Sequence, residues 1–263
     1  TMKPYINMLI WITFAPLFST AQVVVESELT FRSSAFPGRA ETKTLRLRNV
    51  GKTSQRYTIS KSDLKSDCDS GYVYLPHGTT PYSNAGWIDL ERYSGELAPG
   101  QQEEIKVKLS VPSEFSGAAS RSCLLVESAP VTASTAHGKL NVRVRYAIGM
   151  VYRNPTVSGE VLMHAQRLSL DTNSGVWALQ YLNAGNVDRI VSSRVRIVDS
   201  SGQVVYRSDH TPSKGILPNQ CRTFHLETVP KASLPPGNYE MVVLSETDTG
   251  EKFGVTKTLR WDD

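Results

Sequence analysis

The most regular hydrophobic pattern in the chain lies between residues 139 and 153. Apolar positions alternate along this stretch with mostly polar or small ones, as in a β-strand with one apolar face. At about 3.3 Å per residue the apolar positions span roughly 40 Å, although strands of five or six residues are usual. This length raises the question of what the apolar face covers. The apolar positions are Leu140, Val142, Val144, Tyr146, Ile148, Met150 and Tyr152.

The rest of the chain from Val23 onward shows short strand patterns, turn signals and almost no helix. Short segments rich in β-branched and aromatic residues, separated by Pro-Gly, Ser-Gly and Thr-Gly turns, are typical of β-sandwiches. The stretch 127–138 is small, polar and interrupted by proline, which predicts a flexible loop directly before the long strand. The other expected strands cover residues 42–52, 55–60, 103–111, 121–128, 176–183, 193–200, 203–208, 222–228 and 239–246.

Two short motifs occur twice and indicate two copies of one sandwich design. LRLRNVG at 45–51 and LQYLNAG at 179–185 share the form Leu-x-x-x-Asn-x-Gly. Further along, LAPGQ at 97–101 and LPNQ at 217–220 each lead into a strand. The second half of the chain therefore repeats signals of the first half in the same order.

The boundary between the two copies is expected at Asn154-Pro155, where proline ends the long strand. The sequence thus predicts an all-β fold of two immunoglobulin-like β-sandwich domains in tandem, at 22–153 with last strand 139–153, and at 154–263. The chain has 263 residues, of which 40% are hydrophobic and 21% charged. That composition is typical of a globular protein.

The N-terminal segment, residues 1–21, has the pattern of a secretory signal peptide. A single Lys3 precedes an apolar stretch that ends in the small residues Ser-Thr-Ala. These are the charged start, the apolar segment and the cleavage region of such a peptide. We expect cleavage before Gln22 and export of a soluble chain. The alternative is an uncleaved membrane anchor, which is disfavoured because the apolar stretch is short and contains a proline.

An exported protein is expected to pair two of its three cysteines. We expect the disulfide Cys68–Cys123, because both residues lie in the first half of the chain. This pairing leaves Cys221 unpaired. Cys221 is then either a buried small apolar residue or a catalytic thiol, and the buried residue is favoured.

The sequence contains no recognisable catalytic or metal-binding pattern. None of its five histidines has the spacing of metal ligands, and no nucleophile elbow, phosphate loop or dinucleotide-binding glycine motif is present. The formal net charge of +4 is modest and gives no case for a nucleic-acid partner. The sequence favours a binding protein with no enzymatic activity, no metal and no cofactor.

An exported two-sandwich protein with a loop that leads into a long alternating strand resembles the periplasmic chaperones of the chaperone–usher pilus pathway. In that family the last strand of the first domain ends in an aromatic-Arg-Pro junction. MVYRNP at 150–155 is similar to that junction, with one residue inserted before the proline. TKTLRLRN followed by Gly51 resembles the family's second strand, and GILPNQCRTFHL resembles its second-domain proline turn and strand. The resemblance covers most of residues 23–263.

The resemblance implies a role for the long strand. A pilin subunit lacks one strand of its sandwich, and the family's chaperones donate three alternating apolar residues to the open groove. Leu140, Val142 and Val144 occupy those places, while residues 146–152 would pack in the chaperone's own core. Alternatively, all seven apolar residues face the home core and the strand is merely long.

The resemblance also implies an anchor for the pilin's C-terminal carboxylate, formed in the family by an arginine of the first strand and a lysine before the aromatic-Arg motif. Arg32 in ELTFRSS lies near the place of the arginine, but Gly149 stands where the lysine is expected. Arg145, four residues earlier on the same strand face, is a candidate substitute roughly 13 Å away. Arg153 lies where the family has an interdomain ion pair, so we expect a carboxylate of the second domain beside it.

The sequence therefore predicts a periplasmic chaperone that binds pilin or fimbrial subunits by donor-strand complementation and delivers them to an outer-membrane usher. Its partners would be these subunits and the usher. We expect no nucleic acid and no cofactor. The chaperone would also be able to form a dimer in which two copies cap each other's exposed strand. Two other hypotheses stay open. One is a structural or adhesive surface protein of tandem immunoglobulin-like domains, and the other is an enzyme with an unrecognised site.

Overall fold

The computed structural model describes residues 23–69, 71–135, 138–171, 176–226 and 234–261. The expected signal peptide, residues 1–21, lies outside these ranges. The described elements are strands, apart from one 3₁₀ turn, η1 (Ala85–Trp87). Among the described helical segments, none has the length and apolar character needed to cross a membrane.

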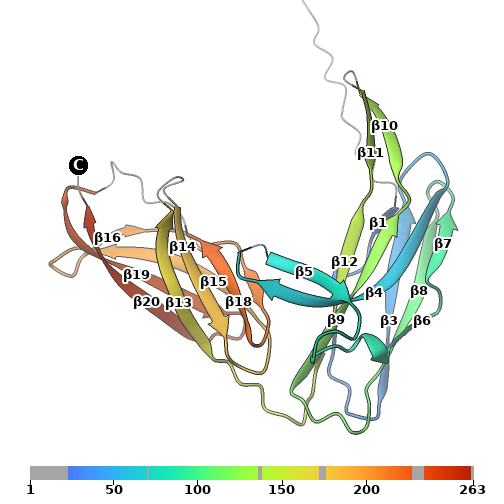
Figure 1. Ribbon diagram of the computed structural model, residues 1–263, viewed down its shortest axis with the longest axis horizontal. Coiled ribbons are helices and arrows are strands. Elements are labelled where there is room, and N and C mark those ends of the chain that lie inside the picture. The colour runs from blue at the N-terminus through green and yellow to red at the C-terminus, as the bar shows by residue number, and fades with distance from the viewer. Residues whose placement is uncertain (1–22, 70, 136–137, 172–175, 227–233, 262–263) are drawn as a thin grey trace, which may run out of the picture.

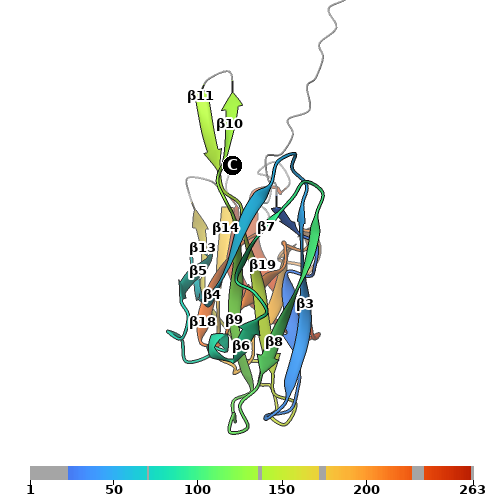
Figure 2. The same cartoon turned by 90° about the vertical axis from the view of Figure 1, so that its right-hand side faces the viewer.

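The first half of the chain forms a sandwich of two sheets (Figure 1, Figure 2). One sheet has the order β1-β3-β8-β6, and the other has the order β2-β12-β9-β4-β5 with β7 beside β4. Side chains from both sheets meet in one apolar core. The strands are β1 (Val23–Val25), β2 (Thr30–Ser33), β3 (Ala40–Asn49), β4 (Gln55–Asp67), β5 (Gly71–Pro76), β6 (Ile88–Leu90), β7 (Ser94–Leu97), β8 (Gln102–Ser110), β9 (Ala119–Ser128) and β12 (Arg145–Arg153).

The second half forms another sandwich with a core of its own. Its sheets have the orders β13-β14-β18 and β16-β15-β19-β20, with β17 beside β15. The predicted fold class, two immunoglobulin-like sandwiches in tandem, is confirmed. The strands are β13 (Met163–Asp171), β14 (Val176–Asn183), β15 (Arg189–Val198), β16 (Val204–Arg207), β17 (Lys214–Ile216), β18 (Gln220–His225), β19 (Gly237–Thr247) and β20 (Lys252–Trp261).

The repeated Leu-x-x-x-Asn-x-Gly motif makes the same hydrogen bonds in both halves. Its asparagine is fully buried and donates to the carbonyl four residues later and to the carbonyl at the end of β7 or β17. Its Oδ1 atom accepts from the N–H two residues later. An unbonded buried amide would cost about 1–3 kcal/mol, so each asparagine fixes its strand to two turns. The bonds join Asn49 to Thr53, Leu97 and Gly51, and Asn183 to Val187, Ile216 and Gly185.

Residues 127–138 are not the flexible loop that their composition predicts. Strand β9 continues to Ser128, and β10 (Val131–Thr135) follows after two residues and pairs with β11 (Gly138–Val142). We call β10 and β11 the arm, because they project beyond the first sandwich in both views (Figure 1, Figure 2). The described part of the segment therefore forms regular strands.

The single strand expected at 139–153 is also wrong, because the structure divides it into β11 and β12. Arg145 pairs with Glu127, whereas Val142 pairs with Val131, so the β9–β10 side carries one residue more between the two pairs. An extra residue on one strand is a β-bulge. Pro130 lies in this bulge and has no N–H to donate to the ladder. The alternation of side chains thus continues through a break in the strand.

The end of β4 leaves its sheet and forms a two-stranded ribbon with β5. β4 pairs with β9 only as far as Ser62, and it pairs with β5 from Ser62 to Asp67. We call residues 63–76 the ribbon. Figure 1 shows it reaching from the first sandwich toward the second.

A buried carboxylate fixes the base of the ribbon. Asp63 is fully buried and accepts hydrogen bonds from Thr79 N and Thr80 N, both at 2.8 Å, and from Ser83 Oγ at 2.5 Å. Burial opposes ionisation of Asp63, but the bonds from Ser83 and the backbone outweigh it and hold the pKa of Asp63 below its ordinary value. The charged form therefore stabilises the folded state.

We expect Asp63→Asn to lower the free energy of unfolding at pH 7 by about 1–3 kcal/mol, because an amide cannot accept three bonds and leaves a buried donor unpaired. The folded-state pKa is depressed, so the contribution of Asp63 is present above the ordinary aspartate pKa of about 3.9 and is lost as the pH falls below it. Denaturant titrations between pH 7 and pH 2 should show a flatter acid limb for the variant. Asp209→Asn, at an exposed carboxylate, is the control and should change neither quantity.

Candidate functional site

The residues expected to be donated to a partner lie on the arm and at its base. Leu140 and Val142 belong to β11, and Val144 lies in the break before β12. The side chain of Leu140 is outside the described part. Val142 and Val144 are half-buried and belong to neither of the two sandwich cores.

The later part of the alternating stretch packs in the home core, which confirms that prediction. Ile148 and Tyr152 are fully buried, Met150 is nearly so, and Tyr146 packs against the same core. The alternative in which all seven apolar residues face the home core is wrong for Val142 and Val144.

One edge of this stretch lacks a strand neighbour in the described part of the chain. β11 pairs with β10 and with no other described strand. β12 pairs along its full length with β9, but with β2 only from Gly149 to Tyr152. From β11 to Ile148 the chain therefore presents a strand edge to which another chain can add.

A cleft of about 270 Å³ lies between the two halves. The small residues on the outer face of β12, Ala147, Gly149 and Val151, form part of its floor. Tyr72 and Tyr74 of the ribbon form another wall. The second half contributes Asp188, Ile190, Ser213, Gly215 and Leu217.

Arg121 is a buried cation in the wall of this cleft that the sequence analysis missed. It lies on β9 opposite Val151, is 4% exposed, and its guanidinium stacks on the ring of Tyr82 at 5.1 Å. Burial lowers the pKa of Arg121 to about 10, so the group stays charged at neutral pH. Its Nε atom is buried with no hydrogen-bond partner. The available signal was an arginine inside the apolar strand RSCLLVES.

Of the two arginines expected to bind a carboxylate, only one lies at the cleft. Arg32 lines it from β2, opposite Val151. Arg145 does not line it and instead forms an ion pair with Glu127 on the neighbouring strand. Arg32 therefore shares the cleft with Arg121 and not with Arg145.

The expected disulfide Cys68–Cys123 is wrong, because Cys68 pairs with Cys221 and Cys123 is a free thiol. Cys123 lies in the centre of its sheet opposite Ser62, and Cys68 is six residues further along β4 and its turn, roughly 20 Å away. The assumption that both partners lie in one half failed because the ribbon carries Cys68 to the other sandwich. A catalytic role for a free Cys221 thiol is excluded by the same bond.

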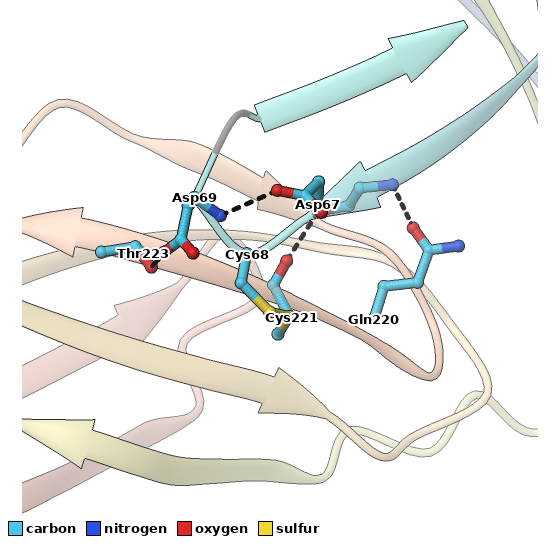
Figure 3. The surroundings of a disulfide bond; sticks show 7 residues. Asp67, Cys68, Asp69, Gln220, Cys221 and Thr223 are labelled. Carbon is cyan, nitrogen blue, oxygen red and sulfur yellow. Dashed lines mark hydrogen bonds between the residues drawn. A yellow bond between two sulfur atoms is a disulfide. The ribbon is translucent and has the colours of Figure 1, made fainter.

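Hydrogen bonds between the two halves surround the disulfide (Figure 3). Ser66 donates from its N–H to the side chain of Gln220 and from Oγ to the carbonyl of Cys221 at 2.7 Å. Thr223 N donates to the carbonyl of Cys68 at 2.9 Å. The tip of the ribbon therefore lies along the edge of β18.

Two consecutive residues make polar contacts at the junction between the sandwiches. Arg153 Nη2 lies 2.8 Å from Asp188 Oδ1, so a second-half carboxylate is next to this arginine. Asn154, the residue inserted before the proline, is 4% exposed and donates from Nδ2 to Gly117 O at 3.1 Å. That the ion pair fixes the two halves stays a prediction.

The described residues contain no group of three or more histidine, cysteine, aspartate or glutamate side chains that could hold a metal ion.

No protein-family profile and no curated protein sequence matches the chain. Solved structures do match. A chain of the CsuC–CsuE chaperone–tip adhesion subunit pre-assembly complex, from archaic chaperone–usher Csu pili of Acinetobacter baumannii, is 12% identical with a TM-score of 0.52, and the match covers 90% of this chain and 98% of that one.

Two further matches are structures of chaperones. The class 5 fimbriae chaperone CfaA is 13% identical with a TM-score of 0.48, over 90% of this chain and 98% of that chain. The chaperone YadV is 13% identical with a TM-score of 0.46, over 90% of this chain and 100% of that chain. At such identities the Csu match shows that this chain shares the fold.

We expect the Arg153–Asp188 pair to contribute about 1 kcal/mol to the free energy of unfolding, measured as the coupling energy in a cycle of Arg153→Ala, Asp188→Ala and the double variant. The pair is 27% and 14% exposed, so water screens it less than the surface pair Arg46–Glu104, which is 49% and 51% exposed. The same cycle on Arg46 and Glu104 is the control. A coupling energy no larger than that of the control would show that the junction does not depend on this ion pair.

Proposed function

We propose that this protein is an assembly chaperone that binds a pilin-type subunit by adding a strand to the subunit's incomplete sandwich. The observation that carries the proposal is the arm and the edge that continues from it into β12. Half-buried aliphatic residues belonging to neither sandwich core lie along a strand whose outer edge has no described strand neighbour. Strand addition needs both features, because backbone groups supply the hydrogen bonds and alternate side chains fill the pockets.

Burial of Leu140, Val142 and Val144 in the subunit's groove would contribute favourable free energy to such a complex. Burial of an aliphatic side chain contributes about 1.5–3 kcal/mol before the cost of ordering the strand. Val142 and Val144 are already half-buried, so their contribution lies toward the lower end. The paired backbone of β10 and β11 reduces the ordering cost, since the donated strand is extended before binding.

We infer that the subunit's C-terminal carboxylate binds in the cleft between Arg121 and Arg32. Arg121 is charged, buried and has an unpaired Nε atom, and Arg32 lines the same cleft. Gly149 lines the same cleft without a side chain, and a Cβ atom there would make ordinary contacts with Thr30 and Leu29 at 3.4–3.8 Å. A cation on β9 would thereby replace the lysine that the related chaperones carry on the neighbouring strand.

The remaining parts of the proposal are supported by the sequence resemblance. These are the periplasmic location, delivery of the subunit to an outer-membrane usher, and a dimer in which the exposed edge caps itself. The alternative of an adhesive surface protein uses the same edge for polymerisation. The two functions differ in what the edge binds, either a distinct subunit or further copies of this chain.

We expect Val142→Asp to abolish co-purification of the subunit from periplasmic extract while leaving the melting temperature within about 3 °C of the native value. The carboxylate would enter the subunit's apolar groove, where an unpaired charge costs several kcal/mol. Ile148→Asp should unfold the chaperone itself, because Ile148 is fully buried in the home core. Asn141→Asp, on the same strand at an exposed position, is the matched control and should keep both properties.

Two outcomes would contradict donor-strand binding. One is a stable Val142→Asp protein that still retains its subunit. The other is equal destabilisation by Val142→Asp and Ile148→Asp, which would make the whole stretch a core strand. Polymers of this chain alone that disappear in Val142→Asp would instead support the adhesive function.

We expect a peptide copying the subunit's C-terminal strand to bind at least tenfold more tightly with a free carboxylate than with an amide. A bond from a charged donor is worth about 1.5–3 kcal/mol, and 1.4 kcal/mol corresponds to tenfold in affinity. Calorimetric titration should show the preference reduced to near unity in Arg121→Met and weakened in Arg32→Met. Arg145→Met is the control, since Arg145 pairs with Glu127, and loss of the preference there would overturn the assignment.

A further inference from the structure

The ribbon has little support from its own sheet. Beyond Ser62, β4 has no pairing with β9, and β5 pairs only with β4 among the described strands. An isolated two-stranded ribbon is marginally stable in water. Its base is fixed by buried Asp63, so its tip depends on what it contacts in the second sandwich.

The tip is attached to the second sandwich by one covalent bond and by hydrogen bonds, among them those that buried Ser66 donates to Gln220 and Cys221. The disulfide joins Cys68, in the turn of the ribbon, to Cys221 on β18 across 153 residues of sequence. Tyr72 donates from its hydroxyl to Gly215 O at 3.1 Å, and the Arg222 guanidinium stacks on the Tyr72 ring at 4.4 Å. The Tyr72 hydrogen bond lies at the surface, where water competes for the same groups, and the disulfide is the covalent attachment of the tip to β18.

The ribbon is also a wall of the cleft. Leu64, Tyr72 and Tyr74 line it from the ribbon, and Cys123 lines it from β9. A displacement of the ribbon tip away from β18 would therefore widen the cleft and uncover residues behind these side chains. Cys123, which is 1% exposed, is one of those residues.

We propose that the Cys68–Cys221 disulfide is a redox-sensitive latch that holds the ribbon across the cleft, and that its reduction by a dithiol opens the cleft. In this step a dithiol donor gives two electrons and two protons, the Cys68–Cys221 bond breaks to two thiols, and the donor becomes a disulfide. Both cysteines of the latch are only half-buried, so a dithiol can reach the bond. The inference does not depend on the proposed function.

The free thiol of Cys123 reports directly on the state of the cleft. In the oxidised protein it is the single free cysteine and is buried. Burial also raises the pKa of Cys123 to about 11, so little of the reactive thiolate is present at neutral pH. Access of solvent to the cleft removes both forms of protection.

The experiment compares the rate of maleimide labelling at Cys123 in the oxidised native chain and in the Cys68→Ser, Cys221→Ser double variant. Each protein contains one thiol, so the rates are directly comparable. We expect labelling at least tenfold faster in the double variant, with far-ultraviolet circular dichroism unchanged. Arg46→Ala, which removes a surface ion pair with Glu104 away from the cleft and leaves the latch intact, is the matched control and should label at the native rate.

Reduction of the folded native chain with dithiothreitol provides a second route that does not require the variant to fold. After removal of the reductant, mass spectrometry of the labelled peptides should show Cys123 modified as fast as in the double variant. An unchanged labelling rate at Cys123 in a folded protein that lacks the bond would overturn the latch. Global unfolding on reduction would also overturn it, because the inference requires both sandwiches to survive.

Discussion

The Cys68–Cys221 disulfide constrains the part of the molecule on which the candidate site depends. It joins the tip of a ribbon from one sandwich to an edge strand of the other. A bond that closes a loop of 153 residues removes much conformational freedom from the unfolded chain, about 5 kcal/mol in the chain-entropy description. The ion pair Arg153–Asp188 is a second, separate contact between the two sandwiches. The cleft is lined by residues of both sandwiches, Asp188 among them.

The duplication of the sandwich is the feature that the sequence predicted most directly, because the repeated asparagine has one structural use. Asn49 and Asn183 are both fully buried, and each bonds to carbonyls at two turns. Few side chains can satisfy such a set of donors and acceptors, so the motif can be recognised from the sequence alone. The short strands β1 and β6 were not predicted, because three residues carry too little alternation to be recognised.

The long alternating stretch and the cysteine pairing show where such interpretation fails. Side-chain alternation records which face of a strand is apolar, and it continues unchanged through the bulge at Pro130. Backbone pairing depends on the opposing strand, which the pattern of residues 139–153 does not contain. Proximity of Cys68 to Cys123 along the chain likewise says nothing about a ribbon that leaves its own sheet. In both cases the local sequence does not show which other strand the segment lies beside.

The carboxylate site that we propose gives a physical reason for glycine at residue 149, where the sequence resemblance implies a lysine. A cation is useful to an anionic ligand only where water does not screen it, and Arg121 meets that condition at 4% exposure while remaining charged. Arg121 lies on β9 two residues before Cys123, on the same face of the strand, and Cys123 is the pairing partner of Gly149. A lysine at residue 149 would bring a second charge into the same confined space and raise the cost of burying both. In the carboxylate site that we propose, glycine at this position and a buried arginine on the adjacent strand would form one consistent arrangement, in which β9 supplies the positive charge.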